Sequence, residues 1–407
     1  MTGVFSLLPE AVLVPSPSGA EDLSRYLATG GYAPSPAPDR LLDLIGAAGL
    51  RGRGGAGFPA AVKLRAVRDA PGPHVVVANG EEGEPGSVKD RWLLRHRPHT
   101  VLDGLRLAAA VTRAGRACVY LSDDLAEQAV RRALAERPFG LRLDVVRTEH
   151  TYVAGEETAV VRRIDGGPAL PTAKPPRPFE SGVGGAPTLV ANVETLARIA
   201  LMHARPDAAA LVAGAHLVTL SGAADAALVE VPAGTHLKVL ADLRGYGRAE
   251  AVLLGGLFGG LFGEGWTDLP LDQDHLRAVG GALGCGALHF PGPEDCPVAV
   301  AVEAVAYLTA QSARQCGVCV SGTGALARTL AAVARGEAGH DAVGKLRRWS
   351  EQLPGRGACG LLDAAARIAG TLLAHFPDRI DTHRRPGCPA CAGTAPEDGR
   401  RFTVPVP

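Results

Sequence analysis

Aromatic residues make up only 4% of this 407-residue chain, so a site that stacks a flat ligand has few rings to draw on. An excess of charge of either sign is also missing, because 42 Lys and Arg residues balance 42 Asp and Glu residues. Without a basic surplus, the sequence does not indicate nucleic acid or an anionic membrane as a partner. No N-terminal segment has the order of a signal peptide, and the longest apolar run, 251–262, is about half of a membrane span. These absences favour a cytoplasmic protein with no direct membrane insertion.

The eight cysteines are distributed in a way that favours metal or redox chemistry over disulfide bridges. A chain of this length builds roughly two or three domains with large apolar cores, so it does not need disulfides for stability. Cys316 and Cys319 form one C-x2-C pair, Cys388 and Cys391 form a second, and Cys359 lies between them. Such pairs in a chain without a secretion signal are typical of metal ligands or redox thiols in a reducing compartment.

The first half of the chain alternates strand-like and helix-like segments. Short apolar or β-branched runs predict strands over three segments: 74–78, 117–121 and 141–147. Apolar residues at three-to-four spacing predict helices over three others: 100–111, 123–136 and 156–164. Strands that alternate with helices favour an α/β layer with a mostly parallel sheet. The Gly/Pro-rich stretch 165–190 follows as a long functional loop.

The second half of the chain has a different pattern. Short strands around a helix at 235–243 predict a small α+β module, and Ala and Leu at helical spacing from 297 to 376 predict a helical bundle. The Pro/Gly-rich tail is expected to be extended. We therefore expect four parts: an α/β domain over 1–205, an α+β module over 206–290, a helical bundle over 291–378 and a tail over 379–407.

A glycine-rich segment is the densest single motif. Residues 52–59 read Gly-Arg-Gly-Gly-Ala-Gly-Phe-Pro and formally match G-x-G-x-x-G, with Lys63 shortly after. A Rossmann fingerprint requires a preceding strand, whereas residues 41–50 have a helical pattern, and a P-loop requires Gly-Lys-Ser/Thr, which is absent. Bare backbone N–H groups, a helix N-terminus and Lys63 would nevertheless suit a phosphate. A merely flexible loop is the alternative.

Two further polar segments follow predicted strands. The first reads Asn79-Gly80-Glu81-Glu82-Gly83-Glu84, and carboxylates beyond a strand end lie where open α/β sheets bind ligands. The second group comprises Tyr152, Gly155, Glu156, Glu157, Lys174 and Asn192. Taken singly, an acidic turn is usually solvated, and two acids at a helix start simply complement its dipole.

In this order, the motifs resemble a known family: the NADH- and FMN-binding flavoprotein (F subunit) of respiratory complex I, with the related diaphorase subunits of NAD-linked hydrogenases and formate dehydrogenases. The resemblance runs from about Leu41 to Ala366 and includes Gly-Ala-Leu-Gly-Cys-Gly at 281–286. It implies an α/β FMN-binding domain, a small β-grasp module of the α+β class and a C-terminal helical bundle that carries a 4Fe-4S cluster. The implied substrate is NADH.

The resemblance also assigns roles to individual positions. It places the FMN phosphate and ring edge on Gly52, Gly54, Gly55 and Lys63. It lines the flavin and its ribityl chain with Asn79, Glu81, Glu82, Tyr152, Gly155, Glu156 and Asn192. It turns Phe58, Glu84, Glu157 and Lys174 toward the dinucleotide, and it gives Glu82 and Glu157 as the catalytic carboxylates. Its cluster ligands are Cys316, Cys319 and Cys359.

Several positions depart from the family pattern. The third cluster cysteine of the family is Gly322 here, and glycine has no ligating side chain. Positions 66 and 177, where the family places rings against the adenine, are Ala66 and Arg177. For the cluster, three outcomes stay open: no cluster, a cluster completed by water or a partner ligand, or one completed by the tail pair. The tail pair could equally be an independent metal clip or two inert thiols.

Two classes of function follow. In the first, the chain is a flavoprotein oxidoreductase that passes a hydride from NADH to FMN and releases electrons singly to an iron–sulfur centre. Its acceptor would be a partner iron–sulfur protein or ferredoxin-like subunit, which allows a position peripheral to a membrane complex. In the second class, the chain is a degenerate, non-enzymatic paralogue that serves as a binding or assembly module. NADPH is disfavoured by the acidic Glu84, although Arg177 keeps it open.

Overall fold

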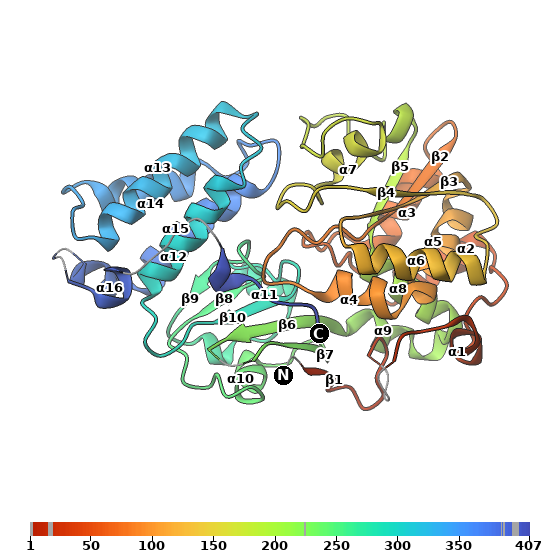
Figure 1. Cartoon of the computed structure of the whole chain (residues 1–407), viewed down its shortest axis with the longest axis horizontal. Helices are drawn as coiled ribbons and strands as arrows, with labels where there is room; N and C mark the ends of the chain where they lie inside the picture. The colour runs from red at the N-terminus through yellow and green to blue at the C-terminus, as the bar shows by residue number, and fades with distance from the viewer. Residues whose placement is uncertain (1–2, 15–18, 224, 384, 386, 393–398) are drawn as a thin grey trace.

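The computed structural model describes residues 3–14, 19–223, 225–383, 385, 387–392 and 399–407. Three groups of elements are visible in Figure 1: a parallel sheet with its helices on the right, a second sheet at the lower centre, and a set of helices on the left. The chain is thus mixed α/β with a parallel sheet, as the sequence predicts.

The first sheet carries the strands that the sequence analysis predicts and one more. It consists of β2 (His74–Asn79), β3 (Ala114–Leu121), β4 (Arg142–Arg147) and β5 (Thr188–Asn192), in the order β4-β3-β2-β5 with every pair parallel. The strand β5 begins inside the stretch expected to be a loop. Its five residues are too short a run to stand out in sequence, and pairing with β2 stabilises them.

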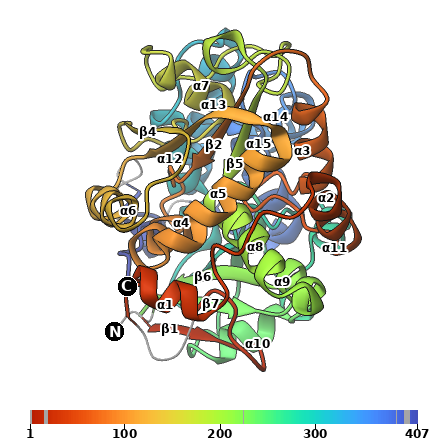
Figure 2. The same cartoon turned by 90° about the vertical axis from the view of Figure 1, so that its right-hand side faces the viewer.

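Both faces of this sheet are covered, which explains its apolar strands. Val75 and Val77 of β2 pack with Val160 of α7 (Glu157–Ile164) on one face, whereas Val76 and Ala78 join the large core on the other. Figure 2 shows α5 running along the sheet. The remaining helices of this part are α1 (Leu23–Ala28), α2 (Pro38–Ala47), α3 (Ala60–Arg68), α4 (Lys89–His96), α5 (Pro98–Thr112), α6 (Asp124–Glu136), α8 (Val193–Ala204) and α9 (Ala209–Gly214).

The second sheet is mixed and includes the start of the chain. Its order is β1-β7-β6-β10-β8-β9, formed by β1 (Gly3–Ser6), β6 (His216–Gly222), β7 (Ala227–Val231), β8 (Val252–Leu254), β9 (Leu261–Phe262) and β10 (Ala287–Phe290). The helices α10 (Leu237–Asp242) and α11 (Gln273–Ala278) lie between these strands in the chain. The sequence analysis places residues 3–6 in the first domain, but β1 pairs in parallel with β7. The two strands are far apart in the chain, so local pattern alone could not reveal their pairing.

The C-terminal part is helical. It contains α12 (Pro297–Ala310), α13 (Gly317–Ala334), α14 (Ala342–Gln352), α15 (Leu361–His375) and α16 (Pro377–Thr382), which share one apolar core. Of the described helices, α13 alone is long and apolar enough to cross a membrane by length and composition, and 44% of it is buried within the protein. A core helix of a soluble bundle meets the same criterion.

The tail is less extended than expected. It contains the short helix α17 (Pro389–Ala392) and a 3-10 turn at Arg400–Phe402. Phe402 is buried, and Val404 N donates to Pro85 O at 3.1 Å. The last residues therefore dock against the acidic loop that follows β2, a contact between distant segments that the sequence does not signal.

Candidate functional site

Two asparagines mark the point where the order of the first sheet reverses. From β2 the chain goes to β3 and β4 on one side, and it later returns to add β5 on the other side. Asn79 ends β2 and Asn192 ends β5, and the two are paired in register. Open parallel sheets bind ligands outside the carboxyl ends of their strands at such a reversal. The structure thus brings together two residues that the sequence analysis assigns to the flavin.

The glycine-rich loop lies beside Asn192. It follows α2 and precedes α3, which confirms that no strand leads into it and that it is not a Rossmann fingerprint. A Cβ on Gly54 would lie 3.3 Å from Cβ of Asn192, so a side chain there would crowd the asparagine. Arg53 N donates to Thr195 Oγ1 at 2.9 Å, which ties the loop to the start of α8. At Gly55 the backbone has φ +107°, a conformation that L side chains rarely adopt.

The loop after β2 carries a buried carboxylate with one unmatched oxygen. The Glu81 side chain is fully buried; its Oε1 lies 3.1 Å from Nδ1 of His150, while Oε2 has no hydrogen-bond partner among the described residues. Asn79 Nδ2 donates to Gly155 O at 2.9 Å, and a Cβ on Gly155 would lie 3.0 Å from Glu81 O. A buried acceptor without a donor is costly. A hydroxyl-bearing chain such as ribityl would supply the missing donor, so these residues fit the expected flavin.

Glu82, which the family resemblance gives as a catalytic carboxylate, accepts hydrogen bonds at both of its carboxylate oxygens. Its Oε1 accepts from the Ser87 hydroxyl (2.6 Å) and Asp90 N (3.0 Å), and its Oε2 accepts from Arg91 N (3.1 Å) and Nε (3.3 Å). These bonds satisfy N–H groups at the start of α4, which have no partners within the helix. Glu82 therefore holds α4 in place.

Glu84 and Tyr152 face the second sheet and the helical part. Glu84 Oε2 accepts from Leu257 N at 3.1 Å, although the sequence analysis turns this residue toward the dinucleotide. Burial raises the pKa of Glu84 to about 8, against hydrogen bonds that lower it. The ring of Tyr152 meets Tyr307 of α12 edge-on, with centroids 6.3 Å apart. The side chains of Glu84 and Tyr152 are therefore oriented by contacts with segments that lie far along the chain.

Two lysines and two glutamates form a partly open cluster at the start of α7. Lys174 Nζ lies 2.6 Å from Glu156 Oε1, and Lys63 Nζ lies 3.4 Å from Glu157 Oε2 and 2.8 Å from Val190 O. Glu156 also caps α7, because its Oε2 accepts from Thr158 N at 2.8 Å. The side chains of this cluster are 16–28% exposed. Phe58, in the glycine-rich loop, is 52% exposed. These groups are open to an incoming anion or ring.

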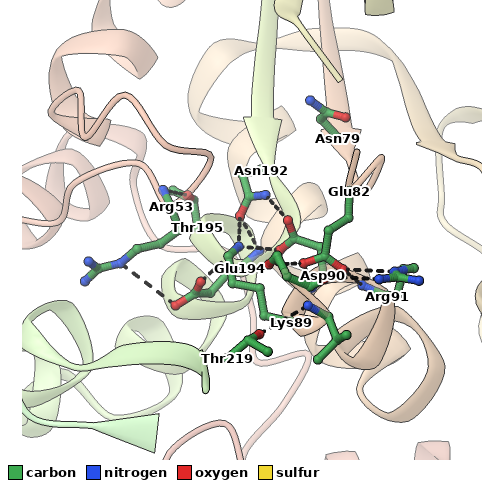
Figure 3. Close-up of polar contacts among 12 residues, drawn as sticks. Arg53, Asn79, Glu82, Lys89, Asp90, Arg91, Asn192, Glu194, Thr195 and Thr219 are labelled. Atoms are coloured by element: carbon green, nitrogen blue, oxygen red, sulfur yellow. Dashed lines mark hydrogen bonds and ion pairs between the residues drawn. The ribbon is translucent and has the colours of Figure 1, made fainter. Parts of the chain in front are cut away.

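A buried ionic network lies beside Asn192 (Figure 3). Lys89 Nζ lies 2.6 Å from Asp90 Oδ1 and 3.2 Å from Glu194 Oε2, with all three side chains nearly inaccessible. Asn192 Nδ2 donates to Asp90 Oδ2 at 2.7 Å, which fixes the orientation of the amide. Burial by itself would raise the pKa of Glu194, but Lys89, Arg198 and Arg53 lower it to about 2. Glu194 is therefore ionised at neutral pH.

Lys89 and Asp90 do not stand out in the sequence as site residues, because a Lys-Asp pair usually lies on a solvated surface. Their position directly after the acidic loop was the available signal. Nor does the sequence indicate a cavity of about 180 Å³ between the glycine-rich loop and the second sheet. Arg53, His216, Gln273 and Cys285 contribute to its lining, and Gly52 is the one expected site residue that does.

The three expected cluster cysteines come together. Cys316, Cys319 and Cys359 line one small cavity of about 20 Å³. Gly322 lies one helical turn after Cys319, where a Cβ would be 3.1 Å from Leu362 and 3.2 Å from Leu353. Three thiols suit a 4Fe-4S cluster, but apolar side chains occupy the fourth position. Cys388 and Cys391 do not complete the set, since they lie with Cys296 and His383.

Comparisons with known proteins agree with this geometry. Residues 45–201 match the family model of the Nuo51 FMN-binding domain, and residues 299–383 match the iron–sulfur binding region of NADH-ubiquinone oxidoreductase F. The F subunit of NADH-quinone oxidoreductase from Streptomyces coelicolor is 31% identical over 94% of each chain. A second F subunit of the same enzyme, from Rhizobium meliloti, is 30% identical over 89% of this chain and 94% of its own.

A solved structure is also similar. The chain superposes on an NAD+-reducing [NiFe]-hydrogenase in the H2-reduced state with a TM-score of 0.74 and 31% identity, over 86% of this chain but only 63% of that one. The parallel sheet and the site at its reversal point lie within the first matched region, and the three clustered thiols lie within the second. The chain therefore belongs to the family of NADH-quinone oxidoreductase F subunits, with the FMN-binding domain and the 4Fe-4S binding region of that family.

Proposed function

We propose that this chain is an NADH-oxidising flavoprotein of a multi-subunit complex. The observation that carries the proposal is the buried Glu81 carboxylate, with an unmatched oxygen, beside the paired Asn79 and Asn192 at the reversal point of an FMN-binding domain. When bound, FMN supplies the chemistry: it accepts a hydride from NADH and releases electrons one at a time. The protein contributes binding, orientation and the exclusion of water.

The contacts support the following roles. Gly52, Gly54, Gly55 and Lys63 hold the phosphate, and Asn79, Glu81, Gly155 and Asn192 hold the ribityl chain and ring. The exposed Phe58 and the partly open Glu157 and Lys174 face the dinucleotide. Glu82, Glu84, Tyr152 and Glu156 keep the surrounding loops and helices in position. Lys63, which pairs with Glu157 here, would hold the more highly charged phosphate in place of that carboxylate.

The electron acceptor is proposed to be an iron–sulfur centre. Cys316, Cys319 and Cys359 are available to hold iron, and a partner subunit with its own cluster would receive the electrons. We propose a cytoplasmic location in which the chain joins a larger redox complex from one side. The four-part organisation, with a β-grasp module around the second sheet and a separate helical bundle, belongs to the same proposal.

The test is an anaerobic purification followed by visible spectra before and after NADH, with NADPH in a parallel sample. A yellow protein that NADH bleaches supports the proposal. A colourless protein that cannot be reconstituted with FMN contradicts it and favours the non-enzymatic binding module. Equal bleaching rates with both nucleotides would contradict the preference for NADH.

Lys63→Ala is expected to weaken FMN binding by roughly tenfold or more, because hydrogen bonds to charged groups contribute about 1.5–3 kcal/mol. The measurement is the FMN dissociation constant by fluorescence titration. Arg65→Ala is the matched control, since Arg65 is an exposed cation on the same helix. Equal dissociation constants for Lys63→Ala and the wild-type chain would remove Lys63 from the phosphate site.

Ala66→Phe is expected to lower the KM for NADH by about 2- to 12-fold, because a ring stacked on a flat partner contributes about 0.5–1.5 kcal/mol beyond burial. Position 66 lies one turn beyond Lys63 on α3 and therefore on the same face. Ala66→Leu is the control, because it adds bulk without a π face. If both variants leave KM unchanged, residue 66 does not lie beside the adenine.

A further inference from the structure

A second group of sulfur and nitrogen ligands lies in the helical part, away from the three cysteines of the iron–sulfur region. It comprises Cys296, His383, Cys388 and Cys391, and one ligand atom from each lies within 4.8 Å of every other. Cys296 is the residue before α12, and His383 follows α16. Cys388 is the residue before α17, and Cys391 lies within it. Three separate segments of chain thus converge on one point.

The separations suit a tetrahedral ion. With Zn–S of about 2.3 Å and Zn–N of about 2.0–2.1 Å, tetrahedral geometry places a sulfur and a nitrogen ligand about 3.6 Å apart. His383 Nε2 lies 3.6 Å from Cys296 Sγ and 3.2 Å from Cys391 Sγ. The C-x2-C spacing of the tail pair is also typical of structural zinc sites.

The imidazole is held in the orientation that a metal requires. His383 Nδ1 lies 2.6 Å from Arg379 O, and a carbonyl oxygen can only accept, so Nδ1 carries the proton. In the neutral ring, Nε2 then presents its lone pair to the sulfurs. Metal-bound histidines commonly have such a second partner on the other nitrogen, which fixes the tautomer and the ring plane.

The burial of the group also requires an explanation. Cys296, His383 and Cys391 are each at most 7% exposed, and Cys388 is partly buried. Burying three thiols and an imidazole together stabilises a core less than apolar side chains would, because polar groups cost free energy when they leave water. A bound cation converts the same set into a closed site with four ligands.

This group is distinct from the iron–sulfur region. The small cavity that Cys316 lines includes Ser312, just beyond the end of α12, whereas Cys296 precedes the start of α12. The 14 residues of α12 hold these points roughly 20 Å apart. Three of the four ligands also lie outside residues 299–383, the segment that matches the family's iron–sulfur region.

We propose that these four side chains bind a single structural zinc ion. A Cys3His set has no open position for a substrate, so the ion acts by joining segments. It ties the tail to the start of α12. Beyond it, Arg401 pairs with Asp295 and Glu303, and Val404 N reaches Pro85 O in the loop that contains Glu81 and Glu84. The zinc thus fastens the tail segment whose Val404 contacts the loop that follows β2.

The test is elemental analysis of zinc and iron in the full chain, expressed with both metals and purified without chelators. We expect one zinc per chain in the wild type. Zinc should be lost in Cys388→Ser/Cys391→Ser and in His383→Ala, and retained in His383→Cys, which keeps four ligands. Cys316→Ser/Cys319→Ser is the matched control and should keep its zinc while losing any iron. Because the result does not involve FMN or NADH, it stands apart from the test of the proposed function.

The wild-type chain itself supplies a measurement in case the variants do not fold. Cobalt exchanged into it should give the strong visible bands of a tetrahedral cobalt–thiolate site, and added zinc should remove them. A wild-type chain with neither zinc nor these bands overturns the proposal. Unchanged zinc in Cys388→Ser/Cys391→Ser, loss of zinc in the Cys316→Ser/Cys319→Ser control, or iron in place of zinc at these ligands overturns it as well.

Discussion

Replacing Lys89 with methionine is expected to lower the free energy of unfolding by about 3–5 kcal/mol, because removal of one partner from a buried ionic network leaves uncompensated charge. Lys89 is 1% exposed and is the cation between the buried carboxylates of Asp90 and Glu194. The free-energy cost of removing one partner is far larger than the net stabilisation that the intact ionic network provides. The substitution also weakens the support of Asn192, because Lys89 Nζ donates to Asn192 Oδ1 at 3.4 Å and to Asp90, the residue that accepts from the Asn192 amide. The measurements are chemical denaturation and FMN retention.

Lys238→Met is the matched control for this substitution. Lys238 pairs with Asp242 at 2.8 Å on a helix surface, where its side chain is 59% exposed. An exposed pair of this spacing contributes about 0.3–0.5 kcal/mol, so the control should lose little stability and no flavin. In Lys89→Met, a loss of stability no greater than in this control would show that water or rearrangement compensates the network.

Gly104→Ala is the second substitution for which we expect a large effect. Gly104 lies in α5, and a Cβ there would be 1.9 Å from Leu196 O and 2.3 Å from Leu196 C of α8. Backbone atoms cannot rotate away as a side chain can, so the two helices must separate. We expect a net loss of about 2–3 kcal/mol, since overpacking outweighs the better helix propensity of alanine. Because Asn192 caps α8, FMN affinity should fall as well.

Gly46→Ala, near the end of α2, is the comparison. A Cβ on Gly46 would lie 3.7 Å from Ala61 Cβ, an ordinary contact. Alanine should therefore be neutral there or stabilise the protein by up to about 1 kcal/mol. If the two variants have the same thermal midpoint, the α5–α8 contact is less tight than the structure indicates.

The segments of the proposed flavin site could be identified from the sequence. Asn79, Glu81 and Asn192 follow apolar strands or lie in motifs with unusual composition, and such positions gather at one edge of a parallel sheet. The pairing of Asn79 with Asn192 could not be predicted, because it depends on β5 adding beside β2 after a long gap in the chain. Glu82 and Glu84 lie in the same acidic segment of the sequence. In the structure, however, Glu82 caps α4, whereas Glu84 accepts a hydrogen bond from Leu257 N.

For the cysteines too, the sequence indicates candidate ligands but not how they are grouped. The C-x2-C spacings identify Cys316, Cys319, Cys388 and Cys391 as candidate metal ligands, and Cys359 follows from the family resemblance. Neither the spacing nor the family resemblance indicates which of these thiols share a metal site. In the sequence, the remaining two ligands of the proposed zinc site are an ordinary loop cysteine and an ordinary histidine. Only the packing of α12, α16 and α17 brings them together.

By itself, the sequence determined the order of strands and helices in the first half, the family, and the segments of the proposed flavin site and of the iron–sulfur region. These are local properties: apolar periodicity, turn residues and motif spacing act over a few residues. The tertiary structure decided the strand order, the inclusion of β1 in the second sheet, the buried partners of Lys89 and the grouping of the tail cysteines with Cys296. Each of these depends on burial and charge compensation between segments far apart in the chain, which no local pattern encodes.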